Sequence, residues 1–82
     1  MSNEEIFKKM QALVAEEFAM EPDEITIETS FEEDLGADSV DLVELVMAME
    51  EEFDVGETQE EELSGLKTVG DAVQFVAGKL NG

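Results

Sequence analysis

Negative charge is the feature that most limits how this chain can fold. It carries 23 Asp and Glu residues against 4 Lys and Arg, a formal net charge of -19 in 82 residues. Repulsion at that density opposes any compact state, and a chain of this length buries only about 60–65% of its unfolded surface. Yet 43% of the residues are hydrophobic, too many for a disordered acidic tail. We therefore expect one small domain over residues 1–82, with a modest core and an acidic surface.

The same composition excludes several functions. Without Cys or His, the chain lacks disulfides, thiolate metal ligands, a Cys nucleophile and the usual general base near neutral pH, so we expect a protein that is not an enzyme. Four basic residues leave no surface for nucleic acid or anionic membranes, and favour a basic partner instead. No apolar run approaches the roughly 20 residues that span a bilayer, and the N-terminus lacks the positive region of a signal peptide. We expect a cytoplasmic protein.

Helical spacing dominates the first part of the chain. From Asn3 to Phe18 the apolar residues lie within an arc of roughly 140°, which predicts an amphipathic helix capped by Ser2 or Asn3. The only Pro, at position 22, follows it within a link over residues 19–37. We expect this link to be an ordered loop rather than a strand, because no second strand signal exists for pairing. Four apolar residues are spaced so that each can pin it to the core: Ile25, Ile27, Phe31 and Leu35.

The second predicted helix begins at Asp38 or Ser39 and runs to about Phe53, and its apolar residues form two stripes. The core-facing stripe comprises Leu42, Leu45, Val46, Met49 and Phe53. The other lies about 100–160° away around the helix and comprises Val40, Val43 and Met47. It is flanked by the acidic residues Glu44, Glu50 and Glu51. Because a helix on a small core needs one apolar face, the second is available to a partner.

The last third of the chain predicts two more helices. The acidic run at 60–62 leads into Leu63 and Leu66, which can anchor one short turn. Thr68 then caps a final helix, with Asp71 completing a capping-box-like pair. Its apolar rhythm is carried by Val69, Ala72, Val73, Val76 and Leu80, and Asn81-Gly82 closes it. The predicted fold is all-α, a small four-helix bundle with three principal helices, one short helix and a long ordered loop between the first two.

Ser39 allows two interpretations. Most Ser residues at such a position cap the helix by accepting backbone N–H bonds. Alternatively, the free N–H groups and the positive end of the helix dipole favour an anion, such as a phosphodiester attached to the hydroxyl. Asp38 can cap in its place and leave Ser39 free.

The stretch FEEDLGADSVDLVELVMAMEEEF, with the later TVGDAV, closely resembles acyl carrier proteins of the fatty-acid-synthase type. The resemblance covers nearly the whole chain. The family's central motif is Asp-Ser-Leu, whose Ser carries 4′-phosphopantetheine, and here it stands as Asp38-Ser39-Val40. The flanking agreement extends over Leu35, Gly36, Ala37, Asp41, Val43, Glu44, Leu45 and Val46. The resemblance implies a four-helix fold and, on Ser39, a covalent arm derived from coenzyme A whose thiol carries acyl groups as thioesters.

The resemblance also implies partners with basic docking patches. These are phosphopantetheinyl transferase, acyl and malonyl transferases, ketosynthases and other acyl-chain enzymes, acting on a monomeric carrier. By position, the docking residues are Asp38, Val40, Asp41, Val43, Glu44, Met47, Glu50 and Glu51. The five Phe residues are expected in the core, which can part, with the Met residues, to admit an acyl chain.

Two departures from the family pattern keep alternatives open. Val40 replaces the Leu that usually follows the Ser, and residues 54–67 lack an Ile-Pro pair and are slightly longer. A dedicated carrier for polyketide or specialised lipid assembly is therefore a second hypothesis. A third, of another class, is an acidic helical interaction module with no prosthetic group. No specific metal site is expected, because residues 33–44, tested as an EF-hand loop, place Asp38 where Gly is required.

Overall fold

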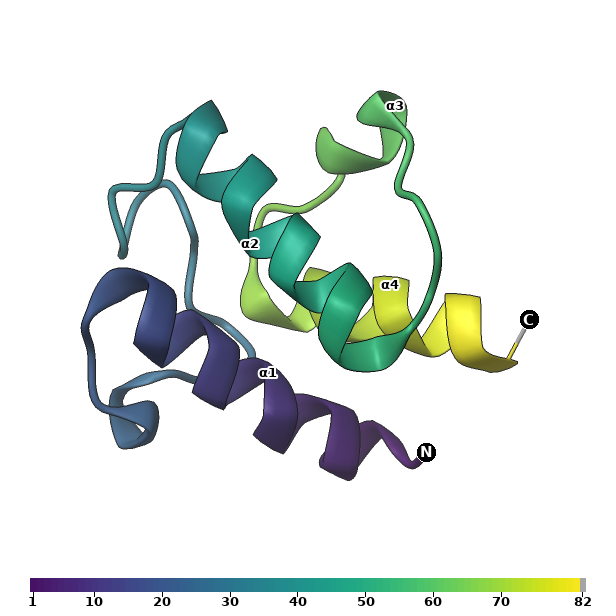
Figure 1. Ribbon diagram of the computed structural model, residues 1–82. Coiled ribbons are helices and arrows are strands. Elements are labelled where there is room, and N and C mark those ends of the chain that lie inside the picture. The colour runs from purple at the N-terminus through teal and green to yellow at the C-terminus, as the bar shows by residue number, and fades with distance from the viewer. Residues whose placement is uncertain (82) are drawn as a thin grey trace.

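The computed structural model describes residues 1–81 and consists of helices joined by loops (Figure 1). The elements in chain order are α1 (Asn3–Phe18), the 3-10 helix η1 (Pro22–Glu24), α2 (Ser39–Phe53), α3 (Glu60–Leu63) and α4 (Val69–Asn81). The predicted all-α fold, with three principal helices and one short helix, is confirmed. Gly82, expected to close the last helix, lies outside the described residues. Over residues 1–81, no helix has the length and apolar character that crossing a membrane requires.

Local chemistry fixes the two ends of α1. The Ser2 hydroxyl accepts the backbone N–H of Glu5 at 3.2 Å, and the Glu5 carboxylate accepts the N–H of Ser2 at 3.1 Å. The backbone bond from Ser2 lowers the pKa of Glu5. At the other end Ala19 adopts a left-handed conformation with φ 54°, and its N–H bonds the carbonyl of Ala15. Of the two predicted caps, Ser2 is therefore the one used.

The three long helices enclose the core. In Figure 1, α2 and α4 run back in the opposite sense to α1, which packs against both. Apolar side chains from all three helices are buried between them, including Ile6, Met10, Leu45, Met49, Val69 and Val76. Leu80, expected on the apolar face of α4, is exposed, because it lies in the last turn of the helix. The predicted cap of α4 is present, with Thr68 and Asp71 exchanging hydrogen bonds of 3.1 Å.

The loop over residues 19–37 is held to the bundle by both side chains and backbone. Ile25 and Phe31 are buried and Leu35 is half-buried, as expected. The expectation that Ile27 lies in the core is wrong, since its side chain is 55% exposed. Its carbonyl instead accepts the N–H of Gly70 at 2.8 Å, and a Cβ on Gly70 would lie 2.4 Å from Ile27 Cγ2. Ile27 therefore packs on the backbone at the start of α4 rather than between the helices.

Two further backbone hydrogen bonds join this loop to the segment around the start of α4. The N–H of Phe31 donates to the carbonyl of Lys67 at 3.0 Å, and the N–H of Val69 donates to the carbonyl of Thr29 at 2.9 Å. Ser30 and Thr68 form an isolated antiparallel bridge between them. The loop over residues 19–37 is thus held in place by a distant part of the chain. The sequence pattern did not predict this pairing.

The buried Phe53 provides a test of the α2 register. Its side chain is 5% exposed, so Phe53→Ala should leave a cavity and reduce the free energy of unfolding by about 3–5 kcal/mol. Met47→Ala, on the exposed side of the same helix, should change it by less than about 0.5 kcal/mol. Urea denaturation followed by circular dichroism measures both. Equal stabilities for the two variants would contradict this orientation of α2.

Candidate functional site

The start of α2 is built by a reciprocal pair of hydrogen bonds. The Asp38 carboxylate accepts the N–H of Asp41 at 2.9 Å, and the Asp41 carboxylate accepts the N–H of Asp38 at 3.2 Å. Gly36, with φ 64°, turns the chain into this cap, and Ala37 donates its N–H to the carbonyl of Phe31 at 2.8 Å. The first turn of α2 is therefore fixed from both sides.

Ser39 is the first residue of α2 and is exposed to solvent. Asp38 occupies the N-cap position, so the interpretation of Ser39 as the cap is wrong. Among the residues described, none hydrogen-bonds the Ser39 hydroxyl. The N–H groups of Ser39 and Val40 lie in the turn where a helix has no internal acceptors, and they favour an anion there. The hydroxyl is thus accessible and positioned for an attached phosphodiester.

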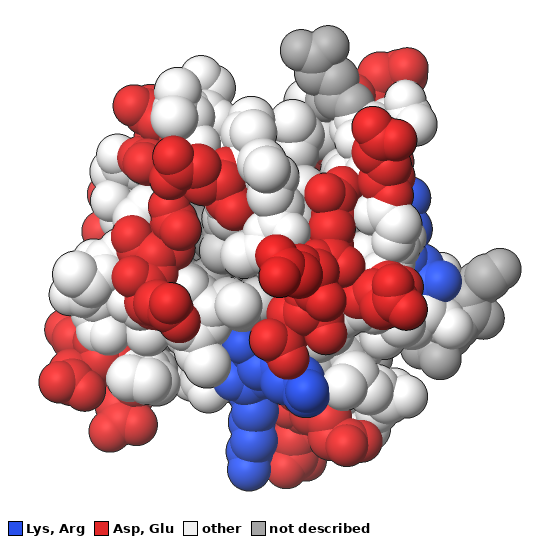
Figure 2. Space-filling view, in the orientation of Figure 1, with Lys and Arg blue, Asp and Glu red and all other residues white. Residues whose placement is uncertain are grey.

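The predicted second apolar face of α2 is present. Val40, Val43 and Met47 are 62%, 43% and 60% exposed. The opposite stripe is buried, apart from the half-buried Leu42. Figure 2 shows uncharged surface over α2 with acidic side chains on both sides of it. Three exposed hydrophobic side chains on one helix are what a docking face requires, although their contact with a partner stays a prediction.

The five predicted docking acids differ in what they contact. Glu51 is exposed, and Glu44 is exposed as well but also faces Glu17 of α1. Asp38 and Asp41 bond each other's backbone in the helix cap. Glu50 is half-buried, and its carboxylate accepts the backbone N–H of Thr58 in the loop after α2. Sequence periodicity placed all five around the helix but did not separate exposed charges from those with a partner within the chain.

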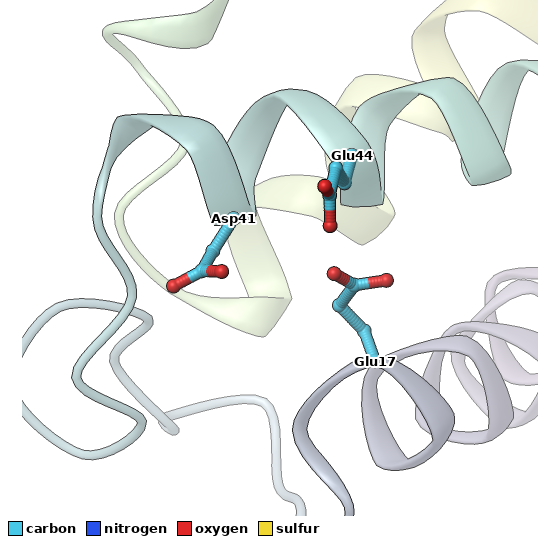
Figure 3. A group of neighbouring side chains, drawn as sticks. All are labelled: Glu17, Asp41 and Glu44. Atoms are coloured by element: carbon cyan, nitrogen blue, oxygen red, sulfur yellow. The ribbon is translucent and has the colours of Figure 1, made fainter.

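A cluster of three carboxylates spans α1 and α2 (Figure 3). One oxygen each from Glu17, Asp41 and Glu44 lies within 4.8 Å of the others, and the Glu17 and Glu44 side chains point toward each other from the two helices. A hydrogen bond with Glu44, then partial desolvation and the charges of Glu44 and Asp41, raise the pKa of Glu17. The sequence offered no signal for this cluster, because a helical period does not say which residues of two helices meet.

An open hollow of about 440 Å³ lies beside the start of α2. Its apolar lining comes from Phe31, Leu42, Leu63 and Leu66. Lys67 and the acidic residues Glu32 and Glu33 of the loop before α2 also line it. Leu42 is three residues after Ser39, so the two side chains lie on the same side of the helix, one turn apart. An apolar chain attached at Ser39 could therefore reach this hollow.

Comparisons with known proteins agree with the geometry. A family model described as a phosphopantetheine attachment site matches residues 8–76. An acyl carrier protein of Prochlorococcus marinus (strain MIT 9515) is 49% identical over 79 residues, covering 96% of this chain and 98% of the relative. The solved structure of an acyl carrier protein from Enterococcus faecalis matches with a TM-score of 0.78 at 32% identity, covering 96% of this chain and 99% of that one.

The chain belongs to the phosphopantetheine-attachment family, whose members carry covalently bound 4′-phosphopantetheine. The resemblance to acyl carrier proteins is thereby confirmed by sequence and by fold.

The carboxylate cluster predicts a pH-dependent stability. Because the folded state raises the pKa of Glu17 above its ordinary value of 4.5, it holds that proton more tightly than the unfolded state does. Stability is therefore lost as pH rises from that value through the raised pKa, and it stays reduced at neutral pH. Glu17→Gln should melt a few degrees higher than the wild type at pH 7, and this gain should shrink toward pH 4.

Glu28→Gln is the control, because it removes the same charge from an exposed position whose charge does not raise the pKa of Glu17. Thermal melts of the three proteins between pH 4 and pH 8 make the comparison. Equal gains for both variants at every pH would assign the effect to net charge rather than to the contact between Glu17 and Glu44.

Proposed function

We propose that Ser39 carries 4′-phosphopantetheine and that the protein is an acyl carrier for fatty acid synthesis. The observation that supports this most directly is the exposed Ser39 at the first turn of α2, released from capping by Asp38, within a chain whose family takes this prosthetic group. The relatives named acyl carrier proteins support the same function.

The residues around Ser39 fit such a group. The Ser39 oxygen would form the phosphodiester, and the N–H groups of the first turn would face the phosphate charge. The chemistry supplied by the arm is that of its terminal thiol, which forms thioesters and which a chain without Cys cannot provide itself. Leu42, Leu63 and Leu66 offer the acyl chain an apolar lining that shields it from water. The protein thus binds and presents its cargo, while the catalytic groups belong to other proteins.

Docking uses the exposed side of α2 in this proposal. Val40, Val43 and Met47 supply apolar contact, and Glu44 and Glu51 supply exposed negative charge beside them. Partners of complementary chemistry carry basic patches with an apolar centre. These are phosphopantetheinyl transferase, acyl and malonyl transferases, and ketosynthases, with the carrier acting as a cytoplasmic monomer.

A carrier dedicated to polyketide or specialised lipid assembly is the second candidate. Val40 supports it, since this exposed β-branched residue presents a shorter side chain than Leu at the point nearest the prosthetic group. The 49% identity to an acyl carrier protein favours the fatty acid pathway. The acyl groups bound to protein isolated from its host distinguish the two.

Modification of Ser39 is directly testable. Incubation with coenzyme A and a phosphopantetheinyl transferase should add one phosphopantetheinyl group to the wild type and none to Ser39→Ala, because only Ser39 presents its hydroxyl at the start of α2 in this motif. Intact-mass spectrometry measures the addition. Ser64→Ala, at an exposed Ser outside the motif, is the control and should be modified like the wild type. No addition to the wild type would leave the acidic interaction module as the alternative.

The docking face is tested by charge reversal. Glu44→Lys with Glu51→Lys should lower the association rate with a ketosynthase or the transferase roughly tenfold, with a weaker dependence on salt, because both charges lie beside the apolar face. Glu28→Lys, at an exposed position in the loop before α2, gives the effect of reversing one charge elsewhere. Surface plasmon resonance at several salt concentrations measures the rates. If the double variant bound as the wild type does, the interface would lie on another surface.

A further inference from the structure

Glu50 differs from the other acids on the exposed side of α2. Glu51 and Glu52, which follow it, are exposed, whereas Glu50 is half-buried. Its carboxylate accepts the backbone N–H of Thr58, eight residues further along the chain. A hydrogen bond to a charged acceptor is among the stronger ones in proteins. Glu50 is therefore directed into the chain and not toward an approaching partner.

The loop that Glu50 contacts has little else to order it. Asp54 and Gly56 both have left-handed backbones, with φ 52° and φ 81°, so the chain turns twice after α2. Among the side chains described, only Glu50 hydrogen-bonds residues 54–58, and Val55 adds a half-buried apolar contact. The conformation of this loop therefore depends on Glu50 more than that of a helix, which is held by its own backbone hydrogen bonds, would.

Thr58 adds a second observation. Its hydroxyl is buried with no hydrogen-bond partner among the described residues, and such burial costs roughly 1–3 kcal/mol. An unfavourable burial persists only where neighbouring contacts hold the residue in place. Among the described hydrogen bonds, the one from the Thr58 N–H to Glu50 is the only one that Thr58 forms.

Thr58 directly precedes the cap of α3. Gln59, the next residue, is the N-cap of α3, and its N–H bonds Glu62 at 3.0 Å. The same Glu62 carboxylate forms an ion pair with Lys79 of α4 at 3.2 Å. Leu63 of α3 and Leu42 of α2 line the hollow beside Ser39. A four-residue helix held at two points forms one wall of that hollow, and Glu50 provides one of the two points.

We propose that Glu50 is a positioning residue, which fixes α3 against α2 through the Thr58 N–H and so sets the width of the acyl-chain hollow, instead of serving as a docking charge. The part of this inference that concerns the acyl chain rests on the proposed function. The contact itself exists without the prosthetic group, so its effect on α3 can be measured independently.

The test compares Glu50→Gln with Glu50→Ala. Gln keeps an oxygen that can accept the Thr58 N–H but loses the charge, whereas Ala loses both. Positioning predicts that Ala raises amide hydrogen exchange in residues 58–66 roughly tenfold, as expected for a lost bond to a charged group, while Gln raises it much less. A docking charge predicts instead that neither Gln nor Ala changes the exchange in the free protein. Glu57→Ala, one residue before Thr58 and exposed, controls for removing a charge from this loop.

The second measurement uses protein loaded with an octanoyl group. Octanoylation should raise the melting temperature of the wild type and of Glu57→Ala, and should raise that of Glu50→Ala less, because its hollow no longer closes on the chain. Release of the octanoyl group by hydroxylamine should be faster from Glu50→Ala by the same reasoning.

Exchange in Glu50→Ala equal to that of the wild type, or equal acceleration in Glu57→Ala, would overturn the role of Glu50. Faster exchange in Glu50→Ala alone, with no difference in octanoyl stabilisation or release, would overturn its link to the hollow. Failure of the wild type to accept the prosthetic group at all would instead count against the proposed function. The exchange measurement would still test the role of Glu50, because it does not need the prosthetic group.

Discussion

The start of α2 depends on the hydrogen bonds that Asp38 and Asp41 exchange. They supply the acceptors that the first turn of the helix lacks, and they do so without using the next side chain. Ser39 can therefore face solvent with a free hydroxyl at the first position of the helix. Burial of the apolar stripe orients the helix, with Leu45 and Met49 toward the core and Val40 and Met47 away from it. In the proposed function the attachment site and the docking face share one helix, and capping by Asp38 leaves the Ser39 hydroxyl free.

Some of the many acidic side chains of the chain stabilise the starts of its helices. At each of the five helix starts, an acid three residues into the helix accepts the N–H of the cap residue. The acids that do this are Glu5, Glu24, Asp41, Glu62 and Asp71. Each carboxylate lies at the positive end of a helix dipole, where its charge is stabilised. The cost of repulsion elsewhere is visible where Glu17 meets Glu44, a contact that favours a shared proton at the expense of stability at neutral pH.

Sequence periodicity predicted what depends on one helix at a time. The bounds of α1 and α2, the two apolar faces of α2 and the Thr68 cap of α4 all follow from spacing within a short stretch. Ile27 was placed wrongly because the spacing of apolar residues in a loop cannot distinguish packing in the core from packing on the backbone of Gly70. The contacts of Glu17 and Glu50 were missed for a related reason. They join residues of different elements, and their partners are set by how the helices cross and how a loop returns.

The backbone bonds between residues 27–31 and 67–70 have a consequence for the order in which this protein matures. During synthesis the motif around Ser39 emerges well before residues 67–70 exist to hold the preceding loop. The carbonyl of Phe31 accepts the N–H of Ala37 beside the cap, and the N–H of Phe31 donates to the carbonyl of Lys67. The surroundings of Ser39 therefore reach their final form when most of the chain has been made. An enzyme that recognises the folded start of α2 would act on finished molecules and pass over nascent ones.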